Sequence, residues 1–171
     1  ETLDWNKAHT SVETYLLTNL MEGLVTYDSK MNVVPAISES WSKSPDGTQY
    51  TFKIRQDVKW SDGVPLTSKD FLYSWKRLLS PITSASYAYL LFDIENAEDF
   101  YNGKVTDFSK VGIHTPDDFT LVVKLSKPIA HFIHIPTFWV TYPLRQDIVE
   151  KYGTSWASPG RMVTVGPFTL S

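Results

Sequence analysis

Residues 44–81 contain a turn, a strand pattern, a second turn and a helix pattern in immediate succession. Pro-Asp-Gly at 45–47 is a typical turn sequence. Apolar and polar side chains then alternate from Tyr50 to Arg55, so one face of the predicted strand is apolar and the other faces water. The first half of the stretch therefore predicts a half-buried strand.

The second half predicts a helix with a defined start. An Asp-Gly pair at 62–63 predicts another turn, and Thr67 begins the sequence Thr-Ser-Lys-Asp. This is a variant of the capping box, in which the side chains of the first and last residues bond each other's backbone amides. A helix is therefore expected to start at Ser68 and to end at the Ser-Pro pair at 80–81. Its buried stripe is expected to consist of Phe71, Leu72, Trp75, Leu78 and Leu79.

The rest of the chain adds helix and strand patterns in an irregular order. Residues 11–24 are expected to form a helix that Gly23 ends. Its apolar residues near helical spacing are Val12, Tyr15, Leu16, Leu20 and Leu24. Further helical segments are expected around 36–41, in part of 84–104 and at 145–153, and strands at 24–28, on both sides of 116–118 and from 165 onward. Because no regular βαβ rhythm occurs, the predicted fold class is α+β (mixed α/β), with a mixed, mostly antiparallel sheet and packed helices.

The composition excludes several classes of function. There is no cysteine, so disulfide scaffolds, thiolate metal sites and cysteine nucleophiles are excluded. The formal net charge is -3 and no run of five like charges occurs, which argues against nucleic-acid binding. No apolar run approaches the roughly 18 residues of a membrane helix. The first residues do not form a signal peptide, so any export signal is expected either to have been removed or to lie outside this sequence.

No residue pattern makes a positive case for catalysis or for a metal site. His131 and His134 could share a helix face, but no carboxylate lies within six residues of them to complete a metal site. Nucleophile-elbow, phosphate-loop and dinucleotide-binding motifs do not occur. The acidic residues that could pair for glycoside hydrolysis fall in predicted turns or on polar helix faces, where solvated charges are expected. They are Glu39, Asp93, Glu95, Asp99, Asp117 and Asp118.

Three motifs occur together and in the same order as in one known family. They are LMEGLVTYDSKMNVVPAISESW at 20–41, SPDGTQYTFKIRQDVKWSDGVPLTSKDFLYSWKRL at 44–78 and VGPFTL at 165–170. As a set they closely resemble the extracytoplasmic solute-binding proteins of peptide ABC transporters, in particular the oligopeptide-binding branch. The resemblance covers essentially the whole chain.

The resemblance implies a domain organisation. Members of that family are much longer and have two lobes that close on the ligand, so this chain would be an N-terminal fragment. Residues 1–21 would be the first segment of a discontinuous domain I, residues 22–145 would form an extra domain, domain II, and residues 146–171 would return to domain I. Because half of the cleft would be missing, the chain alone is not expected to bind peptides at submicromolar strength.

The resemblance also implies which residues contact the ligand. In the family the ligand lies extended between the lobes, and its backbone pairs with protein strands, so main-chain hydrogen bonds give affinity without sequence choice. His9, Thr10 and Ser11 fall where relatives place a ligand-contacting segment, and Tyr87 falls where they place an aromatic contact. The sequence departs from the family pattern at Trp5, where proline is usual, and at His9, where oligopeptide binders can have an acid. Both departures bear on the charge preference of the pocket.

The implied function is that of the substrate-binding subunit of an ABC importer, which captures oligopeptides and delivers them to permease subunits in the inner membrane. Such a protein would be exported to the periplasm or the cell-envelope exterior and would act as a monomer, without a cofactor, nucleic acid or enzymatic activity. Lipid anchoring of the mature N-terminus stays open. The same scaffold could instead carry dipeptides, nickel chelates, haem or oligosaccharides. A hydrolase or a carbohydrate-binding module is the alternative from another class.

Overall fold

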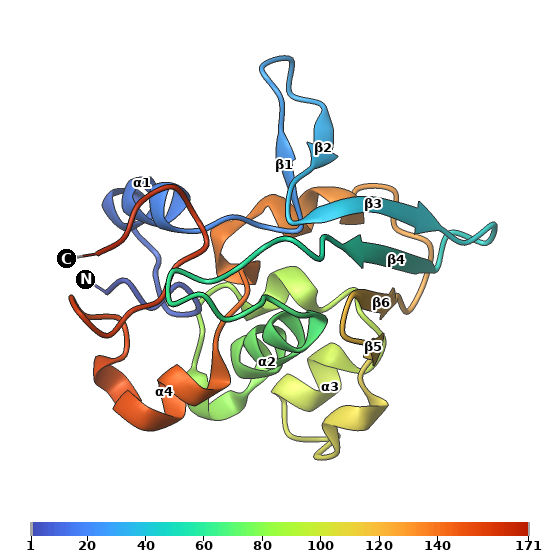
Figure 1. Cartoon of the computed structure of the whole chain (residues 1–171). Helices are drawn as coiled ribbons and strands as arrows, with labels where there is room; N and C mark the ends of the chain where they lie inside the picture. The colour runs from blue at the N-terminus through green and yellow to red at the C-terminus, as the bar shows by residue number, and fades with distance from the viewer. Residues whose placement is uncertain (1, 171) are drawn as a thin grey trace.

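The computed structural model describes residues 2–170, which form one four-stranded antiparallel sheet, a separate hairpin and surrounding helices (Figure 1). The helices are α1 (Ser11–Leu20), α2 (Ser68–Leu79), α3 (Ala97–Tyr101) and α4 (Gln146–Tyr152). The strands are β1 (Val25–Tyr27), β2 (Val33–Pro35), β3 (Ser38–Lys43), β4 (Gln49–Ile54), β5 (Ile113–Asp117) and β6 (Thr120–Lys124). Short 3-10 turns are η1 (Pro81–Thr83), η2 (Ala88–Leu91), η3 (Phe108–Lys110), η4 (Phe132–Thr137), η5 (Trp139–Thr141) and η6 (Gly153–Ser155). The predicted α+β class is confirmed.

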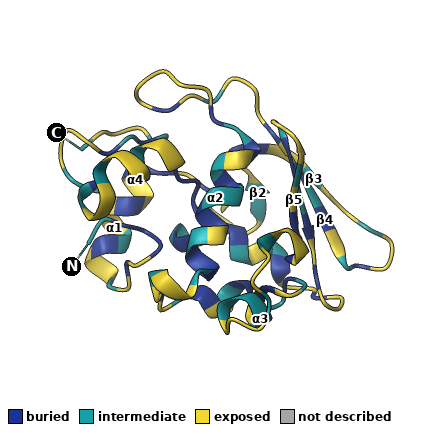
Figure 2. Ribbon diagram, turned by 90° about the horizontal axis from the view of Figure 1, so that it is seen from below, coloured by how far each residue is buried: buried dark blue, intermediate teal, exposed yellow. Residues whose placement is uncertain are grey.

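The four-stranded sheet has the order β3-β4-β6-β5 and buries one face against the helices. Tyr50 lies opposite Val123 and Phe52 lies opposite Leu121, so these four apolar side chains share a face. All four are at least 98% buried, and α2 contacts both β5 and β6. Figure 2 shows the sheet nearly edge-on, with the helices gathered on one side of it. The alternation in residues 50–55 is therefore the pattern of a strand whose inner face packs on a helix.

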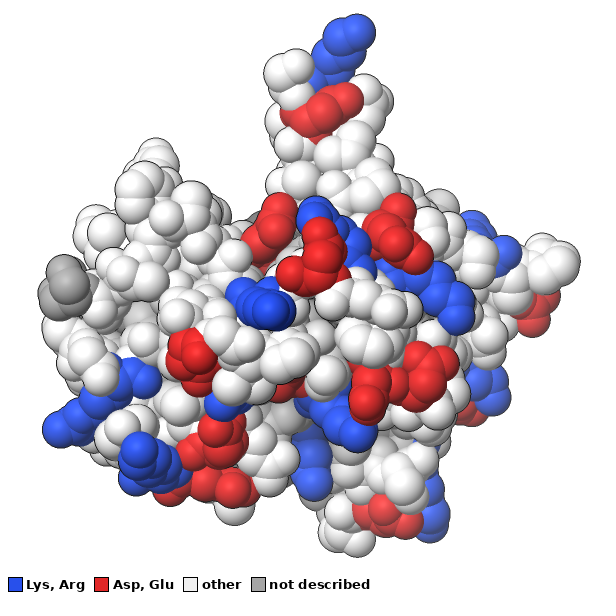
Figure 3. All heavy atoms as spheres, in the orientation of Figure 1, with Lys and Arg blue, Asp and Glu red and all other residues white. Residues whose placement is uncertain are grey.

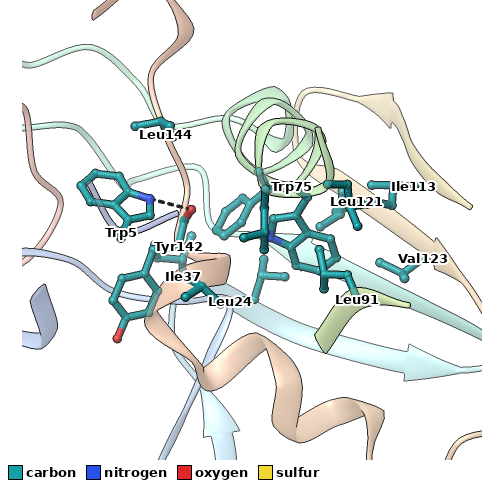
Figure 4. Close-up of a cluster of buried hydrophobic side chains, with 14 of the residues drawn as sticks. Trp5, Leu24, Ile37, Trp75, Leu91, Ile113, Leu121, Val123, Tyr142 and Leu144 are labelled. Carbon is teal, nitrogen blue, oxygen red and sulfur yellow. Dashed lines mark hydrogen bonds between the residues drawn. The ribbon is translucent and has the colours of Figure 1, made fainter. Parts of the chain in front are cut away.

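Helix α2 starts at the predicted residue because Asp70 binds the backbone of the capping residue. The Thr67 amide donates to Oδ2 of Asp70 over 2.9 Å, and the indole of Trp60 donates to the same oxygen over 3.3 Å. Burial raises the pKa of the Asp70 carboxyl group, while these hydrogen bonds and the charge of Arg145 act in the opposite direction. The expected stripe is buried on α2 except for Leu72, which is half-buried. Trp75 lies in the centre of the hydrophobic cluster in Figure 4.

Helix α1 differs from the prediction in both its length and its buried face. It ends at Leu20, and Met21 is already extended, because the carbonyls of Gly23 and Leu24 pair with the amides at 37 and 38. Gly23 therefore does not stop the helix; a Cβ there would lie 2.6 Å from the Pro136 carbonyl oxygen. The side chains that α1 buries are Glu13, Leu17 and Leu20, whereas Val12, Tyr15 and Leu16 are exposed.

Two further local predictions are wrong because strand pairing overrides local preference. The helical turn expected around 36–41 is replaced by β3, in which Trp41 pairs opposite Phe52. Conversely, residues 165–170 are not in a strand: the Gly166 amide donates to the Leu20 carbonyl, but no ladder follows in the described part of the chain. A segment becomes a strand where a neighbouring strand offers backbone N–H and C=O groups for hydrogen bonding. Which segment will lie beside it cannot be seen in the local sequence.

Candidate functional site

The segment before α1 is anchored by a buried polar network. Arg77 of α2 forms a two-pronged ion pair with Asp4, with Nη1 to Oδ1 at 2.7 Å and Nη2 to Oδ2 at 2.5 Å. Nη1 also donates to Oδ1 of Asn6 over 2.9 Å. Asp4 and Asn6 are only 7% and 1% exposed, so in the folded protein these polar groups form hydrogen bonds with one another's partners in the network instead of with water. A buried, bidentate pair of this kind fixes orientation as well as distance.

The same segment is bound to the carbonyl groups of residues 140–142. Asn6 donates to the Val140 carbonyl over 3.0 Å, and the indole of Trp5 donates to the Tyr142 carbonyl over 3.2 Å, the dashed line in Figure 4. From the other side, Ser74 and Trp75 of α2 donate to the carbonyls of Tyr142 and Thr141 over 2.6 and 2.8 Å. Residues 140–142 are therefore held between α2 and the N-terminal segment.

Glu13 then sets the conformation of residues 9–11. Its carboxylate accepts hydrogen bonds from the amides of Thr2, His9 and Thr10 at 2.6, 2.8 and 2.8 Å. Thr10 is the N-cap of α1, and its hydroxyl accepts from the Glu13 amide over 3.4 Å to complete a capping box. Burial raises the pKa of Glu13, but the hydrogen bonds from Thr2, Thr10 and His9 outweigh it and lower the pKa to about 2. The Glu13 side chain is thus a buried carboxylate that organises this segment.

The predicted ligand-contacting residues of this segment lie at the surface on a fixed backbone. His9 and Ser11 are exposed and Thr10 is half-buried. Nδ1 of His9 lies 3.3 Å from the Lys7 carbonyl oxygen, while the His9 amide is held by Glu13. The hydroxyl of Ser11 stands at the first residue of α1. The three residues together present polar groups at the N-terminal end of a helix, where the backbone carries positive partial charge.

Tyr87 belongs to an aromatic cluster that sequence reasoning missed. Its ring meets Trp139 edge-on at 5.8 Å, Phe138 at 6.3 Å and Tyr89 at 6.1 Å between centroids. Tyr87 is half-buried, while Tyr89 and Phe138 are 57% and 38% exposed. The apolar run at 129–140 predicts core, and nothing in it distinguishes Phe138 and Trp139 from buried residues.

Both predicted parts of the site are connected to residues 138–142, Tyr87 directly and residues 9–11 through the chain on either side of them. Residues 9–11 lead into α1, which contacts η5, and Tyr87 packs on Trp139 at the start of η5. Tyr87 thus contacts Phe138 and Trp139, while Trp5 and Asn6, a few positions before His9, bind the carbonyls of residues 142 and 140. The polar groups of residues 9–11 and the aromatic ring of Tyr87 are groups suited to non-covalent binding.

The candidates for metal binding and catalysis are dispersed. His134 shares a 2.8 Å hydrogen bond between its Nδ1 and the hydroxyl of Tyr27, and Nε2 of His131 lies 3.9 Å from Asp93. Within residues 2–170, no group of three or more His, Asp or Glu side chains is placed to hold a metal ion. Of the acidic candidates, Glu95 pairs with Lys124, Asp99 with Lys104 and Asp118 with Lys69, all at the surface.

Charged side chains of both signs are interspersed on the face of the molecule shown in Figure 3, and no continuous basic surface extends across it. Among the helices of residues 2–170, none combines the length and the apolar character needed to cross a membrane.

Comparison with known proteins gives consistent matches. The family profile described as bacterial extracellular solute-binding proteins, family 5 Middle, matches residues 32–171. The periplasmic oligopeptide-binding protein OppA of Haemophilus influenzae is 36% identical over 173 residues, which cover 100% of this chain and 32% of that protein. A dipeptide-binding protein of Lactococcus lactis subsp. cremoris is 40% identical over 151 residues, covering 88% of this chain and 27% of that protein.

One of the solved structures with a similar fold is a complex with a peptide. The crystal structure of Haemophilus influenzae OppA in complex with RPPGFSPFR superposes with a TM-score of 0.92 and 37% identity, covering 96% of this chain and 32% of that one. The chain spans about a third of the length of the curated relatives that it matches.

Proposed function

We propose that this chain, which belongs to the bacterial extracellular solute-binding proteins of family 5, serves in the capture of extended oligopeptides for an ABC importer. The observation that carries the proposal is the similarity over nearly the whole chain to a peptide-bound structure, at a TM-score of 0.92. A dipeptide-binding relative with 40% identity favours, as second candidate, the same scaffold with a shorter peptide.

In this proposal residues 9–11 and Tyr87 contact the peptide. Residues 9–11 offer polar groups whose position is fixed by Glu13, and Tyr87 offers the edge and face of an aromatic ring. A rigid backbone beside the ligand favours recognition of the peptide main chain, which is the same for every sequence. The protein would accept peptides of many sequences if the pockets that receive the peptide's side chains do not favour particular residues.

The domain assignment is also a proposal. Residues 22–145 contain the whole four-stranded sheet together with α2 and α3, as expected of a domain II. The segments 1–21 and 146–171, proposed for domain I, touch through Trp5 and Trp156, whose rings meet edge-on at 4.7 Å. Closure of two lobes on the ligand would then change the surface presented to the transporter.

The partners proposed are the peptide and the permease subunits of an ABC transporter. The family is extracellular by description, and the Haemophilus relative is periplasmic by name, which supports an exported location. The protein would work as a non-enzymatic carrier, because its relatives are solute-binding proteins and its candidate site is made of binding groups. A monomeric state is part of the proposal.

Tyr87→Ala is expected to weaken peptide binding by roughly two- to tenfold, because a stacked or edge-on aromatic contact contributes about 0.5–1.5 kcal/mol beyond its buried area. The measurement is isothermal titration calorimetry of the intact protein with a tripeptide. Tyr101→Ala is the matched control, since Tyr101 is also half-buried and packs on another ring, that of Phe92. Equal affinities of wild type and Tyr87→Ala would show that Tyr87 does not contact the peptide. The peptide-binding function itself is tested separately, by whether the wild-type protein binds the tripeptide.

A further inference from the structure

The indole N–H of Trp139 is a buried hydrogen-bond donor without an acceptor. Among the buried side-chain nitrogen and oxygen atoms of residues 2–170, only Nε1 of Trp139 and Nε1 of Trp156 have no hydrogen-bond partner. Three further tryptophans are buried, and each has a partner for its indole. Trp5 and Trp75 donate to backbone carbonyls over 3.2 and 2.8 Å, and Trp60 donates to a carboxylate over 3.3 Å.

An unpaired indole N–H destabilises the free protein. The side chain of tryptophan has one donor and no acceptor, so its whole capacity for hydrogen bonding is unused. The donor has lost its hydrogen bonds to water on folding, and no protein group replaces them. Because buried polar groups in folded proteins are nearly always hydrogen-bonded, the acceptor for such a group is expected to come from outside the chain, as a water molecule or as a ligand.

The surroundings of the two unpaired indoles differ. Trp156 is 1% exposed and packs edge-on against the fully buried ring of Trp5, at 4.7 Å between centroids. Trp139 is half-buried and stacks on the exposed ring of Phe138, at 4.4 Å between centroids and 25° between planes. Its other contact is with Tyr87, which meets it edge-on at 5.8 Å. Of the two indoles, therefore, Trp139 is the one that lies beside a proposed peptide contact at the surface.

The backbone that carries Trp139 is fixed by the buried polar network. Trp139 is the first residue of η5, and the carbonyls of residues 140–142 accept hydrogen bonds from Asn6, Trp75 and Ser74. A donor on a backbone that is already ordered loses little freedom when it binds a ligand. A ligand reaches the covered Nε1 atom only if a neighbouring side chain turns, and rotamer changes of this kind are common on binding.

We propose that the indole N–H of Trp139 donates a hydrogen bond to a main-chain carbonyl oxygen of the bound peptide. The inference rests on the proposed peptide function and adds a ligand-binding residue to that site. Carbonyl oxygens are acceptors that every peptide carries, so this bond adds affinity without favouring any side chain. Because no protein acceptor has to be given up, the peptide supplies a hydrogen bond that the free protein lacks.

The test removes the N–H group and keeps the shape of the side chain. Trp139 is replaced in the intact protein by benzothienylalanine, in which a sulfur atom stands where the indole has its N–H, and trialanine binding is measured by isothermal titration calorimetry. The affinity is expected to fall roughly three- to tenfold, as for one lost hydrogen bond. The same replacement of Trp156 is the matched control, because it removes the other unpaired N–H, and it should leave the affinity unchanged.

Two further measurements separate a bond to the peptide from a structural effect. In the NMR spectrum of the wild type, the indole N–H resonance of Trp139 should move downfield when trialanine is added, while that of Trp156 stays in place. The Tm of the peptide-free protein should not fall when the N–H of Trp139 is removed, because no protein group uses it. A lower Tm would attribute the weaker binding to damaged packing and would overturn the proposal.

The failure of this inference can be distinguished from the failure of the proposed function. If the wild type binds trialanine and the variant at position 139 binds it equally well, the inference is wrong and the peptide function stands. Equal losses at positions 139 and 156 would also overturn the inference, since Trp156 lies in the interior. If the wild type binds neither trialanine nor a mixture of longer peptides, the proposed function is wrong and the inference falls with it.

Discussion

Replacing Asp4 by alanine is expected to lower the free energy of unfolding by about 3–5 kcal/mol, because it leaves the buried guanidinium of Arg77 without its partner. The two side chains are only 10% and 16% exposed, so water cannot replace the lost carboxylate. The Arg77 bond to Asn6 would remain, but one neutral acceptor does not balance a buried charge. Urea denaturation of both proteins at neutral pH measures the difference.

The control for this prediction is Asp57→Ala, which breaks the ion pair to Arg55. Those side chains are 69% and 46% exposed, and the urea midpoint should hardly move. If Asp4→Ala were as stable as Asp57→Ala, the anchoring role of the buried network would be wrong. A double variant with apolar residues at 4 and 77 should recover much of the loss, because the charge left unpaired is then gone.

Glu13→Gln is expected to destabilise the fold by about 2–3 kcal/mol at pH 7. The reason is that the pKa of the Glu13 carboxyl group is 4.5 in the unfolded chain and about 2 in the folded protein, so folding favours the ionised carboxylate. The amide that replaces the carboxylate has one acceptor oxygen for three backbone donors. Because the folded pKa is the lower one, the stabilisation is present in full above about pH 4.5. It is lost as the pH falls towards about 2.

The measurement is the difference in unfolding free energy between wild type and Glu13→Gln, taken at several pH values from 7 to 2.5. Acidic groups common to both proteins cancel in this difference, so its decline reports Glu13. Glu39→Gln on the exposed surface of β3 serves as the control and should give a difference near zero throughout. A difference that stayed constant between pH 7 and 2.5 would rule out the ionised, hydrogen-bonded Glu13.

Secondary structure was predicted well from the sequence where it depends only on residues that are close together in the chain. The turn at 45–47, the alternation from Tyr50 to Ile54 and the start of α2 all depend on residues that are neighbours in sequence. The buried face of α1 could not be predicted in this way. Its most buried polar residue, Glu13, is stabilised by amides at 2, 9 and 10, and this arrangement depends on how the preceding segment folds back.

In the candidate site, too, some features could be predicted from the sequence and others depend on residues far apart in the chain. The resemblance pointed to residues 9–11 and Tyr87, and their role in binding stays a prediction. What holds them in place was not predictable, since Asp4 and Arg77 are separated by 73 positions and nothing in either local sequence identifies the other as partner. Phe138 and Trp139 were likewise hidden, because an apolar run predicts burial and does not reveal which of its rings border the surface.

The most direct test of the central claim is native mass spectrometry of the intact protein purified from its own cells, followed by identification of whatever it releases on denaturation. The account predicts a heterogeneous set of short peptides that share no side-chain pattern. A single non-peptide compound such as haem, a nickel chelate or an oligosaccharide would contradict it. So would an unliganded protein that takes up no peptide from an added mixture.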